Sequence, residues 1–516
     1  MIDQDTICAV STAPGAGGIA VIRVSGPGAV AICNTIFQPK RAGKDLLSQK
    51  AYTLRYGSIV KGEELIDEVL VAVFHAPHSF TGEDTVEITC HGSVYIQQQI
   101  MQLLIDNGCR TALPGEYTQR AFMNGKMDLS QAEAVADLIA STSAGQHRLA
   151  LNQMRGGFSE ELRGLREQLL HITSLMELEL DFSDHEELEF ADRSELSALA
   201  EHIETVIARL ADSFSVGNAI KNGIPVAIIG ETNAGKSTLL NALLNEEKAI
   251  VSDIHGTTRD VIEDTVNMQG ITFRFIDTAG IRETHDTIES IGIERTFQKL
   301  DQASIVLWMI DATDASRQIA LLAEKILPHC KDKQLILVFN KADLLTEPHP
   351  ALSVDLLTNV ASLLPTDHPV DLPSDTLLTD NLPADNLPTD LPADKHPADL
   401  LTDNLPGDLP GNIQSICISA QNKEDIRTLQ NLLVRSARIP SLSQNDIIVT
   451  NVRHYEALTR ALASIRRVRE GLSTHLSGDF ISQDLRECLF HLSDIIGEVT
   501  TDQVLGNIFE RFCIGK

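Results

Sequence analysis

Gly230 to Ser237 read Gly-Glu-Thr-Asn-Ala-Gly-Lys-Ser, the G-x-x-x-x-G-K-S pattern of a phosphate-binding loop. Glycines in such a loop let successive backbone N–H groups face a phosphate, Lys236 can reach the outer phosphates, and the Ser237 hydroxyl suits Mg²⁺. Asn340-Lys341-Ala342-Asp343 follows downstream, and the Asp343 carboxylate can accept hydrogen bonds from guanine N1–H and the 2-amino group. Adenine offers neither donor there, so the two motifs together predict that the nucleotide is GTP or GDP.

Three further segments fit the same site. Asp277-Thr278-Ala279-Gly280 offers a carboxylate for water-mediated contact with Mg²⁺ and a glycine N–H for the γ-phosphate. Gly256-Thr257-Thr258-Arg259-Asp260 fits a switch loop with the Thr258 hydroxyl as a second Mg²⁺ ligand, and Ser419-Ala420 would close over the base. The predicted nucleotide-binding residues are Asn233, Ala234, Gly235, Lys236, Ser237, Thr238, Ser252, Asp253, Ile254, His255, Gly256, Thr257, Thr258, Asp277, Thr278, Ala279, Gly280, Asn340, Lys341, Asp343, Ser419 and Ala420, with Mg²⁺ on Ser237 and Thr258.

One catalytic group of Ras-like enzymes is missing. They place a water-orienting glutamine directly after the D-x-x-G motif, where this chain has Ile281. An apolar side chain cannot orient water, so the site needs another means of positioning it and of balancing charge in the transition state. Arg259, Arg282, Glu289 or a bound cation are the candidates.

The elements that position these motifs alternate between strands and helices. Apolar runs at 224–229, 305–310 and 335–339 predict buried strands, and 239–244 predicts the helix that follows the phosphate loop. Alternation of this kind over residues 221 to about 437 is typical of a doubly wound parallel sheet.

The regions before and after the nucleotide domain show other patterns of predicted elements. Residues 1 to about 123 predict a mixed α/β domain, with strands at 19–24, 69–74 and 85–90, a helix at 94–106 and a turn at the glycine-rich 15–20. Helical periodicity runs from Leu129 to about Ala211 and again from about Thr450 to Leu505, while the acid-rich stretch 177–204 predicts an exposed face or loop.

The fold prediction is therefore an α/β multidomain chain, in which a P-loop GTPase domain with a Ras-like doubly wound sheet is inserted into an α-helical domain and preceded by an α+β N-terminal domain. The expected boundaries are 1–123 for the N-terminal domain, 124–220 for the first helical part, 221–440 for the nucleotide domain and 441–516 for the second helical part. Within the nucleotide domain, residues 347–411 hold twelve acids against one lysine and many prolines, which predicts a disordered insertion.

Composition limits the partners. At 516 residues and a net charge of −30, the chain lacks the basic field of a nucleic-acid binder, so any RNA contact needs a local positive patch or a partner. Arg453, Arg460, Arg466, Arg467 and Arg469 are a candidate patch, or else the solvated face of a charged helix. The eight scattered cysteines and the absence of a long apolar run or signal pattern predict a cytoplasmic protein with no membrane contact.

Several segments outside the nucleotide motifs resemble one family. Phe512-Cys513-Ile514-Gly515-Lys516, Gly256-Thr257-Thr258-Arg259-Asp260, Phe80-Thr81-Gly82-Glu83-Asp84 and Pro114-Gly115-Glu116-Tyr117 look like those of the MnmE (TrmE) GTPases of tRNA wobble-uridine modification. The resemblance spans nearly the whole chain, although the insertion 347–411 departs from the family pattern.

The resemblance implies that the N-terminal domain dimerises and binds 5-formyltetrahydrofolate. The family's folate contacts fall on Arg23, Glu87, Lys126 and Lys516, where cations can meet the glutamate carboxylates of folate and Glu87 can accept from pteridine N–H groups. Cys513 corresponds to a residue viewed in the family as a chemical participant. Its alternative is a structural thiol, because no adjacent base is visible in the sequence.

The resemblance also addresses the missing glutamine. Family members bind K⁺ near the phosphates and are activated when two nucleotide domains meet, and the matching K⁺ ligands are Asn233, Ser252, Ile254 and Thr257. Glu289 matches the glutamate thought to position water through a bridging molecule.

The function that the resemblance implies is a K⁺-stimulated GTPase that works as a homodimer with an FAD-containing MnmG-like partner, in a heterotetramer that acts on tRNA. Together they would add an aminomethyl or carboxymethylaminomethyl group at C5 of the wobble uridine, with a folate one-carbon donor. Two alternatives stay open: a ribosome-assembly GTPase without RNA-modifying chemistry, and a methyltransferase that uses folate alone.

Overall fold

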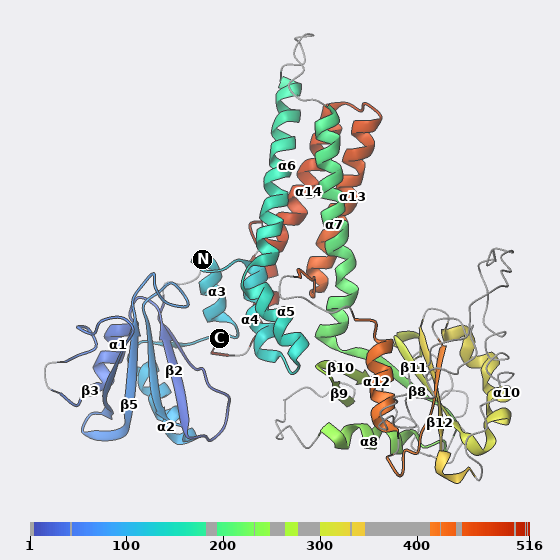
Figure 1. Ribbon diagram of the computed structural model, residues 1–516. Helices are drawn as coiled ribbons and strands as arrows, with labels where there is room; N and C mark the ends of the chain where they lie inside the picture. Colours follow the sequence, from blue (N-terminus) through green and yellow to red (C-terminus); the bar gives the residue numbers. More distant parts are fainter. Residues whose placement is uncertain are drawn as a thin grey trace, which may run out of the picture. The chain divides into compact units, whose positions relative to one another are not determined.

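The structure is a computed structural model that describes residues 5–41, 44–181, 193–231, 233–247, 264–276, 300–330, 333–345, 413–423, 425–439, 446–499, 502–510, 512 and 514–515. The chain forms two compact units. The first unit combines Met1–Lys221 with Leu442–Lys516, and the second is Asn222–Ser441. Each is described by itself (Figure 1).

The N-terminal part of the first unit is a seven-stranded sheet with two helices. The strands run in the order β3-β4-β5-β6-β2-β1-β7 and pair antiparallel except for β1 and β7, which are parallel. Buried residues alternate along the strands and pack with the apolar faces of both helices, which is why this sheet has one covered face. The elements are β1 Ile7–Val10, β2 Ile19–Ser25, α1 Ala29–Ile36, β3 Phe37–Pro39, β4 Thr53–Lys61, β5 Glu64–Phe74, β6 Thr85–His91, α2 Val94–Asp106 and β7 Arg110–Thr111.

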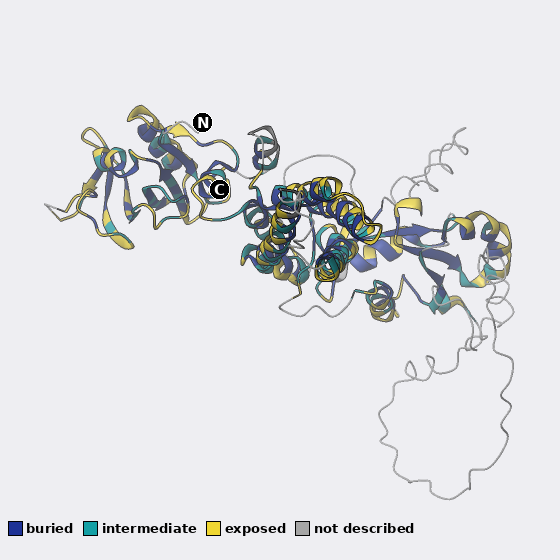
Figure 2. Ribbon diagram, turned by 90° about the horizontal axis from the view of Figure 1, so that it is seen from above, coloured by how far each residue is buried: buried dark blue, intermediate teal, exposed yellow. Residues whose placement is uncertain are grey.

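The rest of the first unit is helical. Its longest helices, α6, α7, α13 and α14, share one apolar core, although the first two precede the second unit in the chain and the last two follow it. Figure 2 shows their buried residues on the inward sides and their exposed residues outward. The helices are α3 Glu116–Met123, α4 Leu129–Ala140, α5 Ala144–Met154, α6 Gly157–Asp181, α7 Arg193–Asn222, α13 Val452–Ser473, α14 Gly478–Ile496 and α15 Asp502–Phe509.

Local signals explain where several of these helices begin and end. Asp128 and Ser143 start α4 and α5 as capping boxes, each accepting from the backbone N–H three residues on while a glutamine side chain accepts from the cap's own N–H. Gly497 ends α14 in the left-handed conformation with φ 85°.

The prediction of an exposed face or loop for the acid-rich stretch 177–204 is confirmed, as an exposed helix face, for its described C-terminal part. Helix α7 begins at Arg193 and buries Leu196, Ala200 and Ile203. Apolar residues at spacings of three and four decide the fold there, and the acids occupy the other face of the helix.

The second unit contains a six-stranded sheet in the order β13-β12-β11-β8-β10-β9, parallel except for β9. The prediction of a doubly wound, mostly parallel sheet is thereby confirmed, and so are the predicted strands at 224–229, 305–310 and 335–339. The elements are β8 Ile224–Ile229, α8 Lys236–Glu247, β9 Asp264–Met268, β10 Ile271–Phe275, β11 Ile305–Asp311, α10 Ala315–Ile326, β12 Gln334–Asn340, β13 Ile413–Cys417 and α12 Ile426–Ser436, with short 3₁₀ turns at Ala312–Asp314, Leu327–Cys330 and Ala342–Leu344.

The register of the parallel strands brings the motifs to one edge. Ile229 at the end of β8 lies beside Trp308 of β11, Asp311 lies beside Asn340 of β12, and Phe339 lies beside Cys417 of β13. Ligands of open α/β sheets bind outside the carboxyl ends of the strands, so this edge is where a nucleotide site is expected. Among the helices that the structure describes, none is long and apolar enough to span a membrane.

Candidate functional site

The loop between β8 and α8 can be built only with glycine at two positions. Gly230 has φ 149°, and a Cβ there would lie 2.3 Å from the Met309 carbonyl oxygen. Gly235 has φ 98°, and a Cβ there would lie 2.2 Å from Asn340 Nδ2. The loop therefore runs directly against β11 and β12, and α8 begins at its end with its N-terminal N–H groups at the sheet edge.

Lys236 is the cation of this loop. It is buried, and its Nζ donates to the carbonyl oxygens of Gly230 and Glu231, at 2.7 Å in each case. Burial lowers the pKa of the Lys236 amine, and the nearby Glu231 opposes that effect. The ammonium thus lies across the mouth of the loop, where phosphate oxygens would compete for the same protons.

Asn340 holds two of the predicted motifs together. It is buried; its Nδ2 donates to the Ala234 carbonyl at 2.8 Å, and its Oδ1 accepts from the Ala420 N–H at 3.0 Å. The first residue of Asn-Lys-x-Asp therefore fixes the distance between the phosphate loop and the loop at 419–420.

The other two residues of that motif have different surroundings. Lys341 has φ 66°, and its Nζ contacts Asp311 Oδ2 at 2.6 Å. Burial would raise the pKa of Asp311, but hydrogen bonds from Lys341 and Thr313 hold that pKa below its ordinary value. Asp343 lies in the 3₁₀ turn that follows and its side chain is exposed, as a carboxylate that meets a base must be.

The structure thus brings together the predicted residues at 233–238, 340–343 and 419–420. Asn233, Ser237 and Thr238 are exposed at the loop. The predictions at 252–258, 277–280, Arg259, Arg282, Glu289, Cys513 and Lys516, and the insertion 347–411, lie outside the described residues.

A second group of predicted residues lies on the N-terminal sheet. Arg23 and Glu87 face each other across β2 and β6, with Arg23 Nε and Nη2 both 2.9 Å from Glu87 Oε1. The Arg23 guanidinium also lies 5.6 Å from the centre of the Phe80 ring and 5.7 Å from that of Tyr117. Two aromatic faces and a carboxylate hold this cation in one orientation.

Lys126 belongs to the same neighbourhood through the loop that carries Phe80. Its Nζ donates to the Pro77 carbonyl at 2.9 Å, and Asn124 donates to the Thr81 carbonyl at 2.7 Å. Gly82 has φ 79°, and a Cβ there would lie 3.1 Å from Asn124. The loop 75–84 is therefore packed against the segment at 124–126.

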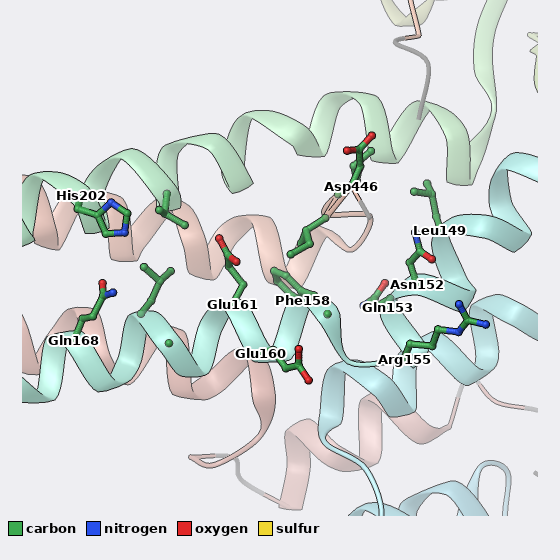
Figure 3. A pocket seen from close by; sticks show the side chains of 16 residues that line it. Leu149, Asn152, Gln153, Arg155, Phe158, Glu160, Glu161, Gln168, His202 and Asp446 are labelled. Carbon is green, nitrogen blue, oxygen red and sulfur yellow. The ribbon is translucent and has the colours of Figure 1, made fainter. Parts of the chain in front are cut away.

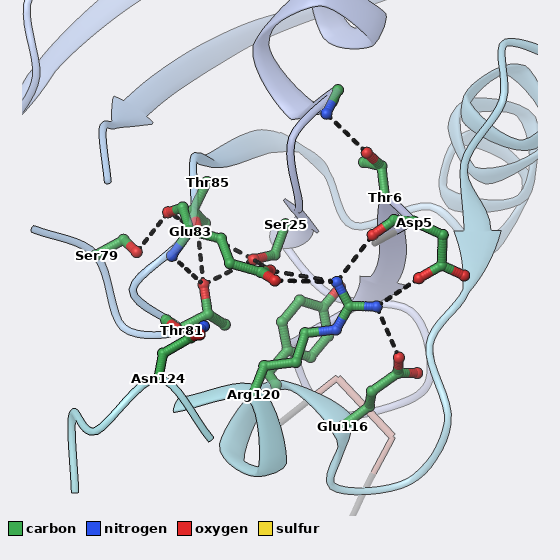
Figure 4. A network of polar contacts seen from close by, with 12 residues as sticks. Asp5, Thr6, Ser25, Ser79, Thr81, Glu83, Thr85, Glu116, Arg120 and Asn124 are labelled. Atoms are coloured by element: carbon green, nitrogen blue, oxygen red, sulfur yellow. Dashed lines mark hydrogen bonds and ion pairs between the residues drawn. The ribbon is translucent and has the colours of Figure 1, made fainter. Parts of the chain in front are cut away.

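Arg120 is the centre of a network of ion pairs close to these residues. It is 1% exposed and contacts Asp5 at 2.7 Å, Glu116 at 2.9 Å and Glu83 at 3.3 Å (Figure 4). Glu83 also accepts from Ser25 Oγ at 2.9 Å. Burial would raise the pKa of Glu116, but Arg110 and Arg120 lower it; the hydrogen bond from Arg110 likewise lowers the pKa of Asp5.

Sequence reasoning missed this network and the aromatic contacts. Phe80, Glu83, Glu116 and Tyr117 lie in segments recognised only as family motifs, and Arg120 was not singled out. One local signal was available, since Glu116 and Arg120 stand at the i, i+4 spacing of a helical ion pair. The contacts to Asp5 and Glu83 have no local signal.

The C-terminal segment lies against the same sheet. Gly515 has φ 93°; a Cβ there would lie 2.4 Å from the Val10 carbonyl, and Ser11 Oγ donates to the Gly515 carbonyl at 3.1 Å. Because Ala9 on β1 is the partner of Arg23 on β2, the segment ends close to the strand pair that carries Arg23.

The candidate basic patch is largely neutralised. Arg453 contacts Glu133, Arg466 and Arg469 contact Glu204, and Arg467 contacts Asp484 and Glu487. Of the two readings of these arginines, the structure favours an ion-paired helix face, because their charges are already matched by carboxylates.

Comparisons with known proteins show which family this chain resembles over its whole length. A family model described as "GTP-binding protein TrmE N-terminus" matches residues 6–126, and one described as "MnmE helical domain" matches residues 129–513. The chain is 65% identical to the tRNA modification GTPase MnmE of Parabacteroides distasonis over 514 residues, which covers 99% of this chain and all of that protein. It is 62% identical to the MnmE of Bacteroides thetaiotaomicron over 515 residues, with both chains covered in full.

Solved structures match the chain less closely. An Era protein of Aquifex aeolicus bound to GDP and aluminium fluoride is 24% identical, with 46% of this chain and 66% of that one covered and a TM-score of 0.24. The FeoB G-domain of Methanococcus jannaschii is 20% identical, with 42% and 97% covered and a TM-score of 0.23.

Proposed function

The chain belongs to the MnmE family of tRNA modification GTPases, and from that membership we propose what it does in detail. It hydrolyses GTP, and with an FAD-containing MnmG-like partner it adds an aminomethyl or carboxymethylaminomethyl group at C5 of the wobble uridine of tRNA. The one-carbon donor is 5-formyltetrahydrofolate. The chain works as a cytoplasmic homodimer within a heterotetramer.

The observation that carries the GTP assignment is the position of Asn340. One buried side chain bonds both the phosphate loop and the loop at Ala420, so the base-reading and phosphate-binding segments keep a fixed spacing. A Cβ at Gly235 would clash with Asn340 Nδ2, so glycine is needed where the phosphate loop meets this amide, and Lys236 donates to the backbone of the same loop. These residues fit a guanine nucleotide.

The metal ions are assigned to hydroxyl and carbonyl ligands of the same loops. Ser237 and Thr258 would hold Mg²⁺, and Asn233, Ser252, Ile254 and Thr257 would hold K⁺. Asn233 and Ser237 are exposed at the phosphate loop, as such ligands must be. The two cations would offset the negative charge that develops on the phosphates, and Glu289 would position water in place of the missing glutamine.

The folate assignment is supported by the chemistry of the N-terminal residues. Arg23 and Lys126 supply cations for the glutamate carboxylates of folate, Glu87 supplies an acceptor for pteridine N–H groups, and Lys516 would add a further cation. Phe80 is 38% exposed beside Arg23, which leaves part of an aromatic face for a planar ring. Cys513 is proposed as a participant in the chemistry, because it lies two residues before Gly515 in the sequence and Gly515 lies against Val10.

The net charge of −30 bears on how tRNA is held. The arginines of α13 that contact carboxylates are not available as a patch, so we assign most of the phosphate contacts to the partner.

The test of the whole proposal is nucleoside mass spectrometry of tRNA from a strain that lacks this chain. The modified wobble uridine should disappear, return with the wild-type gene, and fail to return with Asp343→Asn. Unmodified tRNA in the complemented strain, or modified tRNA in the deletion strain, would refute the proposal.

The cation assignment has its own test. Replacing K⁺ by Na⁺ at equal ionic strength should slow GTP turnover by about tenfold or more, because the smaller ion cannot satisfy the same ligands. Equal rates in the two salts would remove K⁺ from the mechanism.

The ribosome-assembly alternative is separated by folate binding. Titration calorimetry of the full chain with 5-formyltetrahydrofolate should show saturable heat, and the heat should be lost in Arg23→Gln. A chain that hydrolyses GTP but gives no heat with this ligand would favour the alternative.

A further inference from the structure

Arg453 holds the end of a neighbouring helix. It is the second residue of α13, and its Nη1 and Nη2 donate to the carbonyls of Asp494 and Ile495, at 2.8 and 3.0 Å. These carbonyls belong to the last turn of α14, where a helix has no partners of its own for them. A guanidinium there also interacts favourably with the helix dipole.

Glu133 of α4 fixes the same guanidinium from another side. Arg453 Nε lies 3.1 Å from Glu133 Oε1, and Nη2 lies 3.2 Å from Oε2. His454 Nε2 lies 2.6 Å from Glu133 Oε2, and the His454 ring is fully buried, 5.4 Å from the ring of Phe158. Glu133, Arg453 and His454 therefore form a polar joint, with Glu133 and His454 buried and Arg453 partly buried, that connects α4, α13 and the end of α14.

The joint lies directly after the segment by which the chain returns from the second unit. This return segment, residues 446–451, is held to α7, the helix that leads out to that unit. Val449 N donates to Ser213 Oγ at 3.0 Å, and a Cβ on Gly217 would lie only 2.1 Å from the Val449 carbonyl oxygen. Asn451 then caps α13 by accepting from the Arg453 N–H at 3.0 Å. The return segment therefore contacts the outgoing helix α7 at Val449 and leads into the joint at Asn451.

The joint is also connected to the C-terminal segment, because Arg453 bonds the end of α14 and the chain continues from there into α15. The end of α14 is Gly497, where a Cβ would lie 2.8 Å from Leu129 and from Phe122. Helix α15 then packs Leu505 and Phe509 against Leu129 and Ala132. Beyond α15, Gly515 lies against Val10 of the N-terminal sheet.

The return segment also has room to move. A cavity of about 590 Å³ lies between it and helices α5, α6 and α7 (Figure 3). Asp446, Ile447 and Ile448 line one side of the cavity, and Gln153 and Phe158 line another. Gln153 accepts from Thr450 of the return segment, and Phe158 contacts His454 of the joint. Close-packed interiors resist displacement, so a cavity of this size leaves residues 446–448 room to shift relative to α5, α6 and α7.

We propose that Arg453 is a positioning residue that couples the nucleotide state of the second unit to the C-terminal segment beside Arg23. A change in the second unit moves the return segment; the joint transmits that movement to the end of α14, and α15 carries it to the residues against Val10. The inference rests on the proposed function, because it gives GTP hydrolysis a route to the folate-binding residues.

Hydrogen exchange of the full chain tests the proposal. In wild type, exchange of amides in α15 should differ by about fivefold or more between the complexes with GDP and with a non-hydrolysable GTP analogue. In Arg453→Lys this difference should collapse to less than about twofold, because one ammonium cannot bond two carbonyls and a bidentate carboxylate together. The GTP hydrolysis rate should stay at the wild-type value.

Arg467→Lys is the matched control. Arg467 also joins α13 to α14, by a contact of 2.7 Å with Asp484, but it lies away from the return segment and the end of α14. It should keep the nucleotide-dependent difference. A purely structural role of Arg453 would raise exchange equally in both nucleotide states and leave their ratio unchanged.

Three outcomes overturn the proposal: no difference in wild type, a difference that survives in Arg453→Lys, or the same loss in Arg467→Lys. If Arg453→Lys does not fold, Glu133→Gln is judged by the same ratio. The proposed function fails separately, through the wobble-uridine assay, and its failure would not change the exchange ratios.

Discussion

At the scale of single residues, the nucleotide site depends on one amide and one carboxylate that are neighbours in sequence but differ in exposure. Asn340 is buried, and both its amide nitrogen and its amide oxygen form hydrogen bonds with the backbone of the surrounding loops. Asp343 is exposed three residues later. The first therefore sets the geometry of the site, and the second is left free to read the base.

Asp343→Asn should weaken GTP binding by roughly 100-fold, because two hydrogen bonds to a charged acceptor are worth about 3 kcal/mol or more. The Asp343→Asn variant should bind xanthosine triphosphate better than the wild-type chain does, because the new amide can donate a hydrogen bond to the 2-oxygen of xanthine. Competition titration with a fluorescent guanine nucleotide measures both.

The control is Asp301→Asn, which removes an equal charge from an exposed position in the same unit. It should leave both affinities unchanged. If Asp343→Asn kept the selectivity of the wild type, Asp343 would not be the base-reading group.

Glu133 makes the first unit sensitive to acid. Burial would raise its pKa, but His454 and Arg453 lower the pKa to about 2, from an ordinary value of 4.5. Because the folded-state pKa is depressed, the stabilisation is complete above about pH 4.5 and is lost as the pH falls towards 2; it amounts to about 3 kcal/mol. Glu133→Gln should be less stable than wild type at pH 7, and the gap should narrow on acidification.

Calorimetry of the nucleotide-free chain measures this change in the unfolding transition of the first unit. That transition is identified as the one that GDP shifts less, because GDP binds the second unit. A gap between Glu133→Gln and wild type that stays constant from pH 7 to pH 3 would contradict the assignment.

At the scale of elements, the close contact between α7 and the return segment depends on a missing side chain. Gly217→Ala would place a Cβ 2.1 Å from the Val449 carbonyl, so the segment must shift, at a cost of about 1–3 kcal/mol. Gly164→Ala on α6 is the matched change, because nothing lies within 4 Å of its Cβ. It should stabilise the helix by about 0.5–1 kcal/mol.

The melting temperature of the first unit should therefore fall for Gly217→Ala and rise slightly for Gly164→Ala. Equal behaviour of the two variants would mean that the contact at Val449 is not a tight one in solution.

At the scale of the whole molecule, the parallel pairing of β12 and β13 sets how much of the acidic insertion can be removed. Parallel strands need a connection of a dozen or more residues. Deleting 361–400 leaves 32 residues between Asn340 and Ile413 (341–360 and 401–412), whereas deleting 350–410 leaves eleven (341–349 and 411–412).

The shorter deletion should keep basal GTP hydrolysis within about twofold of wild type, and the longer one should lose nucleotide binding. Hydrolysis assays on the purified chains compare them. Loss of hydrolysis in the shorter deletion would show that the insertion contributes to the fold of the second unit.

The sequence predicted those parts of the molecule whose signals are local. The helix at 94–106 and the strand at 224–229 were predicted with their observed bounds, because their apolar periodicity is unbroken. The residues of the phosphate loop were predicted from the G-x-x-x-x-G-K-S pattern, and the structure explains its glycines, because both Gly230 and Gly235 have positive φ.

What could not be predicted depends on partners distant in sequence. Arg120 meets Asp5 and Glu83 only after the sheet forms, and Arg453 meets Glu133 across 320 residues. No periodicity marks such contacts. The acidic stretch after Arg193 left two possibilities open, an exposed helix face or a loop, and the apolar spacing at 196, 200 and 203 decides for the helix face.

The proximity of Gly217 and Val449 has a practical consequence for protein engineering. The two points where the backbone leaves and re-enters the helical bundle are almost touching, so a very short tether of small residues could bridge them with little entropic loss. Excising 222–441 in this way should leave the first unit able to fold on its own, and foreign modules with adjacent ends could be grafted into the gap.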